Sequence, residues 1–142
     1  MPHPYARAVL GVLLAATLFG CSASPPPAQT GVQSSVKVTD IDVGRSIAAD
    51  KTIADKTDSF RPTDIFYVSV KTEGSAPSAT LTARWTYQDG QVVDNSTQTI
   101  APTGPAVTEF HLSKPSAWPV GDYKVEVLLN SASAGTKSFT VK

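Results

Sequence analysis

The chain has 142 residues, with 12 basic and 12 acidic side chains and a single cysteine. This length fits one domain, and the neutral balance of charge gives no basic excess to attract nucleic acid or anionic lipid head groups. One cysteine excludes an internal disulfide, so a packed core must supply the stability. An apolar content of 41% with 17% charged residues suits a β-rich globular domain.

The first 20 residues follow the pattern of a secretory signal peptide. Arg7 precedes an uncharged apolar run from residue 8 to residue 19, and small residues follow that run. The run is shorter than the roughly 20 apolar residues that a membrane-spanning helix needs. We therefore expect residues 1–20 to direct export and to be removed.

The end of this segment, Leu18-Phe19-Gly20-Cys21, resembles a bacterial lipobox. The resemblance implies that a diacylglyceryl group joins the Cys21 sulfur, that signal peptidase II cleaves before Cys21, and that a third acyl chain such as palmitate caps the new amine. Ser22 stands where enterobacterial inner-membrane lipoproteins carry Asp, which implies anchoring in the outer membrane, facing the periplasm. The alternative is an ordinary secretory peptide with an unrelated cysteine.

Residues 21–35 are predicted to be the lipidated cysteine and a tether. The segment has no charged residue and almost no large apolar residue, so it cannot bury enough surface to offset the entropy lost on ordering. Pro25, Pro26 and Pro27 favour extended polyproline II, which stiffens a spacer. Residues 36–142 are then predicted to form the folded domain.

The start of this domain is predicted as a short strand at residues 36–38, followed by a solvated charged loop from residue 44 to residue 57. Carboxylates in one loop could suggest calcium, and three occur here: Asp50, Asp55 and Asp58. The EF-hand spacing is absent, however, and Lys51 and Lys56 lie beside the carboxylates. The sequence therefore predicts no metal and no other cofactor.

From Phe60 onward, apolar and polar residues alternate in the manner of half-buried strands. Strands are predicted at residues 64–71, 80–87, 91–100, 107–112 and 123–129, and a last strand carries Phe139 and Val141. The polar segment 91–100 is expected at a sheet edge. Asp89-Gly90 predicts a type I′ hairpin turn, and a longer turn is expected at residues 130–135. The expected inward residues are Phe66, Val68, Val70, Leu81, Ala83, Trp85, Tyr87, Phe110, Leu112, Tyr123, Val125, Val127, Leu129, Phe139 and Val141.

About seven short strands without a credible helix predict an all-β protein, an antiparallel β-sandwich of two sheets. The residues around Trp85 and Tyr123 resemble an immunoglobulin-like domain. The resemblance implies a buried Trp85 on the third strand and a Tyr123 that hydrogen-bonds to upstream backbone at a corner. Antibody domains have cysteine at the position of Val125, and none occurs near Val68, so the chain is similar to the disulfide-free bacterial type. The segment from Phe110 to Tyr123 also resembles small bacterial envelope domains of unknown function.

Catalytic groups are sparse. His111 is the only histidine beyond the signal peptide, and it should face solvent beside Glu109. Ser113 is close in sequence, but catalysis requires a nucleophile and an orienting acid within reach of the histidine. Phosphate-loop and zinc motifs are missing. The aromatic residues fall mostly on inward positions, which disfavours nucleic acid as a partner. An enzyme is therefore the least favoured hypothesis.

Three side chains are candidate partner contacts. Tyr67 and Arg84 should face outward, and Trp118 lies in a loop bounded by Pro115 and Pro119. Exposed Trp, Tyr and Arg are enriched at interface hot spots, so an envelope protein or a glycan is the expected partner. The alternative for Trp118 is a cap over one open end of the sandwich.

Two functions remain open from the sequence. One is a membrane-anchored, non-catalytic binding or adaptor module in the periplasm. The other is an architectural subunit of an envelope complex with no ligand of its own.

Overall fold

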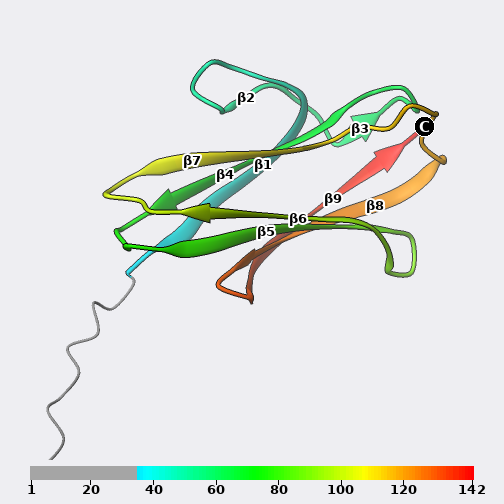
Figure 1. Ribbon diagram of the computed structural model, residues 1–142. Helices are drawn as coiled ribbons and strands as arrows, with labels where there is room; N and C mark the ends of the chain where they lie inside the picture. Colours follow the sequence, from blue (N-terminus) through cyan, green and yellow to red (C-terminus); the bar gives the residue numbers. More distant parts are fainter. Residues whose placement is uncertain (1–34) are drawn as a thin grey trace, which may run out of the picture. The chain divides into compact units, whose positions relative to one another are not determined.

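The computed structural model describes residues 35–142 (Figure 1). The predicted signal peptide, Cys21 and the tether up to residue 34 lie outside the described residues. The described part contains nine strands: β1 (Lys37–Ile47), β2 (Ile53–Lys56), β3 (Ser59–Phe60), β4 (Phe66–Glu73), β5 (Ala79–Tyr87), β6 (Gln91–Ile100), β7 (Ala106–Leu112), β8 (Gly121–Leu129) and β9 (Ala132–Val141). It holds no helix long and apolar enough to cross a membrane.

The strands form two sheets that enclose one core. The four-stranded sheet has the order β2-β1-β4-β7, and the five-stranded sheet has the order β3-β9-β8-β5-β6. All neighbours are antiparallel except β3 and β9, which pair in parallel. The predicted β-sandwich is confirmed, and the polar strand 91–100 lies at a sheet edge as expected.

The alternating residues of both sheets meet in this core. Inward side chains at most 3% exposed come from five of the strands: Phe66, Val68, Val70, Leu81, Ala83, Trp85, Phe110, Tyr123, Val125, Val127, Phe139 and Val141. The Phe66 ring lies near the middle, with ring centroids 4.9 Å from both Phe60 and Phe139. Each large apolar side chain removed from water contributes about 1.5–3 kcal/mol. The predicted inward faces of these strands are confirmed.

The segment 44–57 differs from the expected loop. β1 runs on to Ile47, and β2 returns beside it, so a hairpin stands where a solvated loop was predicted. Ile53 is 7% exposed on this hairpin. Gly44 allows the close approach, because a Cβ there would lie 2.2 Å from the Asp55 carbonyl oxygen. Ile53 is a single buried residue in a polar segment. The sequence there shows no alternation of apolar and polar residues that could predict a strand.

Two turns also differ from the prediction. The β5–β6 connection is a three-residue loop in which Gln88 and Gly90, but not Asp89, have positive φ, so a type I′ turn over Asp89-Gly90 is wrong. Positive φ at two successive residues occurs instead at Asn130 and Ser131, with values of 49° and 69°. This two-residue turn matches the type I′ pattern. β9 therefore begins at Ala132, earlier than expected.

The two ends of the sandwich carry different segments. Near the start of β1, the Ser35 N–H donates to the Ser75 carbonyl oxygen, and Ser75 bridges to Thr103. The opposite end carries the β5–β6 turn, the β7–β8 loop and the C-terminus (Figure 1). The described chain thus enters the domain at one end, and the loop with Trp118 lies at the other.

Candidate functional site

Trp118 is buried at its end of the sandwich. Its side chain is 5% exposed, and its ring stacks on Phe66 with centroids 4.7 Å apart. The indole Nε1–H donates to the Asp64 carbonyl oxygen at 3.0 Å, and the backbone N–H donates to that of Pro62 at 2.7 Å. Of the two alternatives given for Trp118, the structure supports the cap over one open end of the sandwich and not the exposed contact residue. Its acceptors lie more than 50 residues away in sequence, where no local pattern reveals them.

Two tyrosines hold the loop after Trp118. The Tyr123 hydroxyl donates to the Pro119 carbonyl oxygen, and the Tyr87 hydroxyl donates to that of Val120, both at 2.8 Å. The first bond confirms the corner implied by the immunoglobulin-like resemblance. Burial, and secondarily the nearby Tyr87, raise the pKa of the Tyr123 phenol. The loop is thus fixed by two hydroxyl hydrogen bonds.

Around this cap, apolar side chains face solvent. The large apolar residues with the greatest exposure are Ile65 at 39%, Val92 at 58% and Val120 at 62%. Ile65 follows Asp64, which bonds Trp118, while Val92 follows the β5–β6 turn and Val120 precedes β8. We name these three residues the apolar end. The sequence signals for it, valines beside a turn and beside a proline, are too weak to identify it without the fold.

A shallow cavity of about 290 Å³ adjoins the apolar end. Val92, Pro119 and Lys114 line it, together with the edge of Trp118. The Lys114 ammonium nitrogen lies 5.4 Å from the centre of the Trp118 ring. Because Tyr87, Tyr123, Gln91 and Val93 also line the cavity, it offers mixed aliphatic and aromatic surface beside one cation, which suits contact with a protein surface better than chemistry.

The other two candidate contacts, Tyr67 and Arg84, lie on different sheets. Tyr67 is half-buried on β4, and its ring centroid lies 5.7 Å from that of His111. Arg84 belongs to β5 in the other sheet, where its Nη1 lies 3.3 Å from the Glu126 carboxylate. Tyr67, Arg84 and Trp118 therefore do not form one site.

His111 lies on an exposed strand position, as expected. Its Nδ1 is 2.6 Å from the Glu109 carboxylate, which is its one side-chain hydrogen bond among residues 35–142. Within the same residues, no three His, Cys, Asp or Glu side chains gather in a way that could hold a metal ion. Asp50, of the three carboxylates considered for calcium, is bonded to Thr52 instead.

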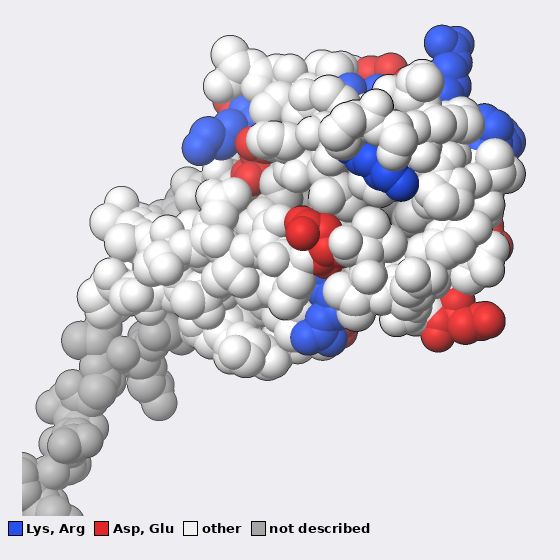
Figure 2. All heavy atoms as spheres, turned by 45° about the vertical axis from the view of Figure 1, so that its right-hand side comes forward, with Lys and Arg blue, Asp and Glu red and all other residues white. Residues whose placement is uncertain are grey.

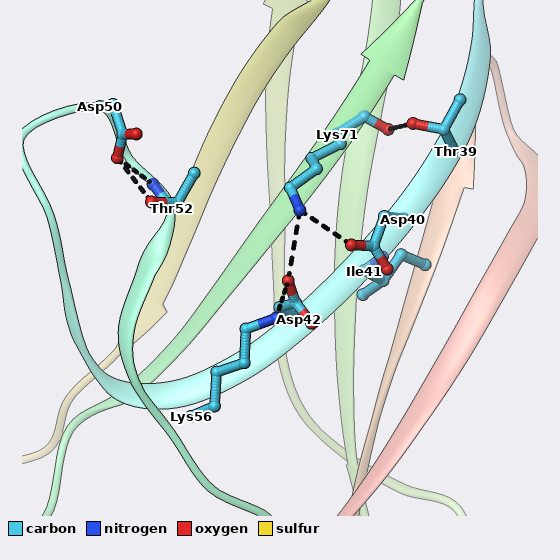
Figure 3. A network of polar contacts seen from close by, with 8 residues as sticks. All are labelled: Thr39, Asp40, Ile41, Asp42, Asp50, Thr52, Lys56 and Lys71. Atoms are coloured by element: carbon cyan, nitrogen blue, oxygen red, sulfur yellow. Dashed lines mark hydrogen bonds and ion pairs between the residues drawn. The ribbon is translucent and has the colours of Figure 1, made fainter.

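A polar network pins β1, β2 and β4 together (Figure 3). The Lys71 Nζ lies 3.0 Å from the Asp40 carboxylate and 3.7 Å from that of Asp42, and the Lys56 Nζ lies 2.8 Å from Asp42. The hydrogen bond from Lys71 lowers the pKa of Asp40, and Asp40 raises that of Lys71. The carboxylates of Asp40 and Asp42 are paired with the ammonium groups of Lys56 and Lys71. We therefore assign the network a structural role.

On one face of the molecule, the charged side chains are dispersed. Figure 2 shows basic and acidic side chains scattered among uncharged atoms on the face that it presents. A dispersed surface of this kind does not provide the continuous basic stripe that marks a nucleic-acid interface.

Comparison with solved structures finds the same fold. An immunoglobulin-like protein from Pseudomonas aeruginosa matches with a TM-score of 0.51 at 18% identity, over 79% of this chain and 100% of that one. A DNA-bound alkylpurine DNA glycosylase from Pseudomonas fluorescens matches with a TM-score of 0.51 at 14% identity, over 78% of this chain. The match spans only 31% of the glycosylase.

These likenesses establish an immunoglobulin-like β-sandwich and nothing beyond the fold. No protein-family model matches the chain, and no curated protein matches its sequence.

Proposed function

We propose that the protein is a non-catalytic binding or adaptor module, held at a bacterial membrane by lipid on Cys21 and contacting an envelope protein through its apolar end. The observation that carries the proposal is the position of Ile65, Val92 and Val120, which are exposed at the end opposite Ser35. A chain that enters at one end of a rigid sandwich and is anchored before that point would present the other end away from the membrane.

The chemistry of the apolar end favours a protein partner over a glycan. Its exposed side chains are aliphatic, and the neighbouring aromatic rings of Trp118 and Tyr123 are buried. Apolar surface removed from water contributes about 25 cal/mol per Å². Exposed aliphatic side chains at one end of a small domain offer apolar area that a protein partner can cover.

A photo-crosslinking amino acid placed at Val92 tests the proposal in intact cells. Thr99 is the matched control, because it is exposed on the same strand β6 near the opposite end. We expect a discrete crosslinked product from position 92, none from position 99, and loss of the product with Cys21→Ser. Equal crosslinking at both positions would refute a role for the apolar end.

The mass of the intact protein tests the anchor separately. We expect cleavage before Cys21 and an added mass of acyl chains, and cleavage elsewhere without added lipid would refute the anchor alone. A single crosslinked partner present at constant stoichiometry would favour the architectural subunit over the adaptor.

A further inference from the structure

One long side of the sandwich is not closed by strand pairing. β3 pairs only with Thr140 and Val141 of β9, so no strand is hydrogen-bonded to the outer side of the stretch 132–138. On the facing sheet, β2 pairs with β1 only from Gly44 onward. The two free edges border a groove of about 230 Å³, lined by residues 38–41 and 134–137.

The free backbone groups of β9 can be identified from the pairing register. The N–H groups of Thr140 and Lys142 donate outward, to the carbonyl oxygens of Asp58 and Phe60. Every second residue of a strand points the same way, so the N–H and C=O groups of Thr136 and Ser138 also point away from β8. These two residues are exposed, and no hydrogen bond joins their backbone groups to another described residue on that side.

The facing edge of β1 is less available. The Val43 carbonyl oxygen accepts from Thr57 on this side, so the Ile41 N–H, two residues earlier, points to the groove. That N–H already donates to the Asp40 carboxylate at 3.0 Å. An incoming strand would therefore pair with β9 rather than with β1.

We propose that the stretch 132–138 of β9 receives an extended segment of a partner protein by strand addition, with an acidic side chain of that segment facing Lys137. This is a second contact surface, separate from the apolar end. A stretch of seven residues spans roughly 23 Å, enough for one added strand. Main-chain hydrogen bonds supply the affinity in this mode of recognition, and side chains supply the specificity.

The charge of the groove decides which strand fits. Lys137 forms no ion pair among residues 35–142, whereas Asp40 on the other wall is neutralised by Lys71. The uncompensated charge is therefore positive. Antiparallel pairing with β9 of a second copy through Thr136 and Ser138 would place two Lys137 side chains opposite each other, which disfavours self-association.

Two synthetic eight-residue peptides test the proposal on the full-length chain in detergent. Both alternate valine and threonine, and one has a central glutamate where the other has lysine. We expect the glutamate peptide to bind about tenfold more tightly and to slow hydrogen exchange at the amides of Thr136 and Ser138. Lys137→Glu should reverse this preference.

Proline substitutions provide the backbone control. Thr136→Pro removes only an outward N–H, so the β8–β9 ladder is preserved and peptide affinity should fall about tenfold. Thr99→Pro is the matched change on β6: the N–H and C=O groups of Thr80 face Asn130, so its partner Thr99 points its N–H outward as well. This second variant should bind the peptide as the unmodified chain does.

Four results would overturn the proposal. Equal affinity for the two peptides, or equal effects of the two prolines, would mean that β9 is not the binding edge. A dimer that Thr136→Pro dissolves would identify a second copy as the occupant. Slow exchange of Thr136 and Ser138 in a monomer without peptide would mean that the chain covers its own edge.

Discussion

Trp118 and Trp85 are both buried, at 5% and 1% exposure, although one lies in a loop and the other in a central strand. Removing a buried tryptophan side chain costs about 3–5 kcal/mol, a large part of the 5–15 kcal/mol that holds a small domain folded. We expect Trp118→Ala to cost as much as Trp85→Ala in chemical denaturation. A loss below about 1 kcal/mol for Trp118→Ala would contradict its assignment as a core residue.

A conservative variant separates packing from hydrogen bonding at this position. Trp118→Phe keeps an aromatic ring against Phe66 but loses the Nε1–H bond to Asp64. Since one such bond contributes about 0.5–1.5 kcal/mol, this variant should retain most of the stability that alanine loses.

Sequence patterns predicted residues whose environment depends on their own strand. The inward sets of β4, β5 and β8 followed from alternation, and the Tyr123 corner followed from the immunoglobulin-like resemblance. The burial of Trp118 did not follow from alternation, because it depends on carbonyl groups of residues 62 and 64 that only the fold brings near. The free edge of β9 was not predicted either, because alternation within one strand does not show which strands lie beside it in the sheet.

At the scale of elements, the β1–β2 hairpin rests on one glycine. A Cβ at Gly44 would meet the Asp55 backbone oxygen at 2.2 Å and the Ile53 Cγ2 at 2.3 Å, and backbone cannot rotate aside. We expect Gly44→Ala to detach β2, which would appear as fast amide exchange at Ile53 together with a loss of stability.

The matched control is Gly135→Ala in β9. Its added Cβ would meet only the Ile41 Cδ1 at 2.7 Å, which is the end of a flexible side chain. This variant should leave exchange in β2 unchanged. If both alanines accelerated exchange at Ile53 equally, close backbone approach at Gly44 would not be the cause.

The polar segment around this hairpin shows why its strand was not predicted. Residues 48–58 are mostly charged or polar, and the ion pairs of Asp42 with Lys56 and Lys71 join β1 to β2 and to β4. A pattern of charged residues does not predict the path of the chain unless the ion-pair partner of each residue is known. The fold class, by contrast, rests on the repeated alternation of the other strands.

At the scale of the whole molecule, the sandwich separates the start of β1 from the C-terminal residue. The start of β1 lies at the end with Ser75 and Thr103, whereas Lys142 bonds Phe60 at the end with the Trp118 loop (Figure 1). The first residue of β1 and the last residue of the chain therefore mark opposite ends. Which of them is anchored determines which surface faces away from a membrane.

Moving the proposed lipid anchor tests this geometry. A lipid attachment fused after Lys142, combined with Cys21→Ser, should bring the apolar end toward the membrane. We expect crosslinking from Val92 to the partner to be lost, although the protein stays folded and membrane-bound. Lengthening the tether before Ser35 by ten flexible residues keeps the original end outward and should preserve the crosslink. Since both variants carry the same domain on the same membrane, crosslinking that survives the relocated anchor would show that orientation does not govern partner contact.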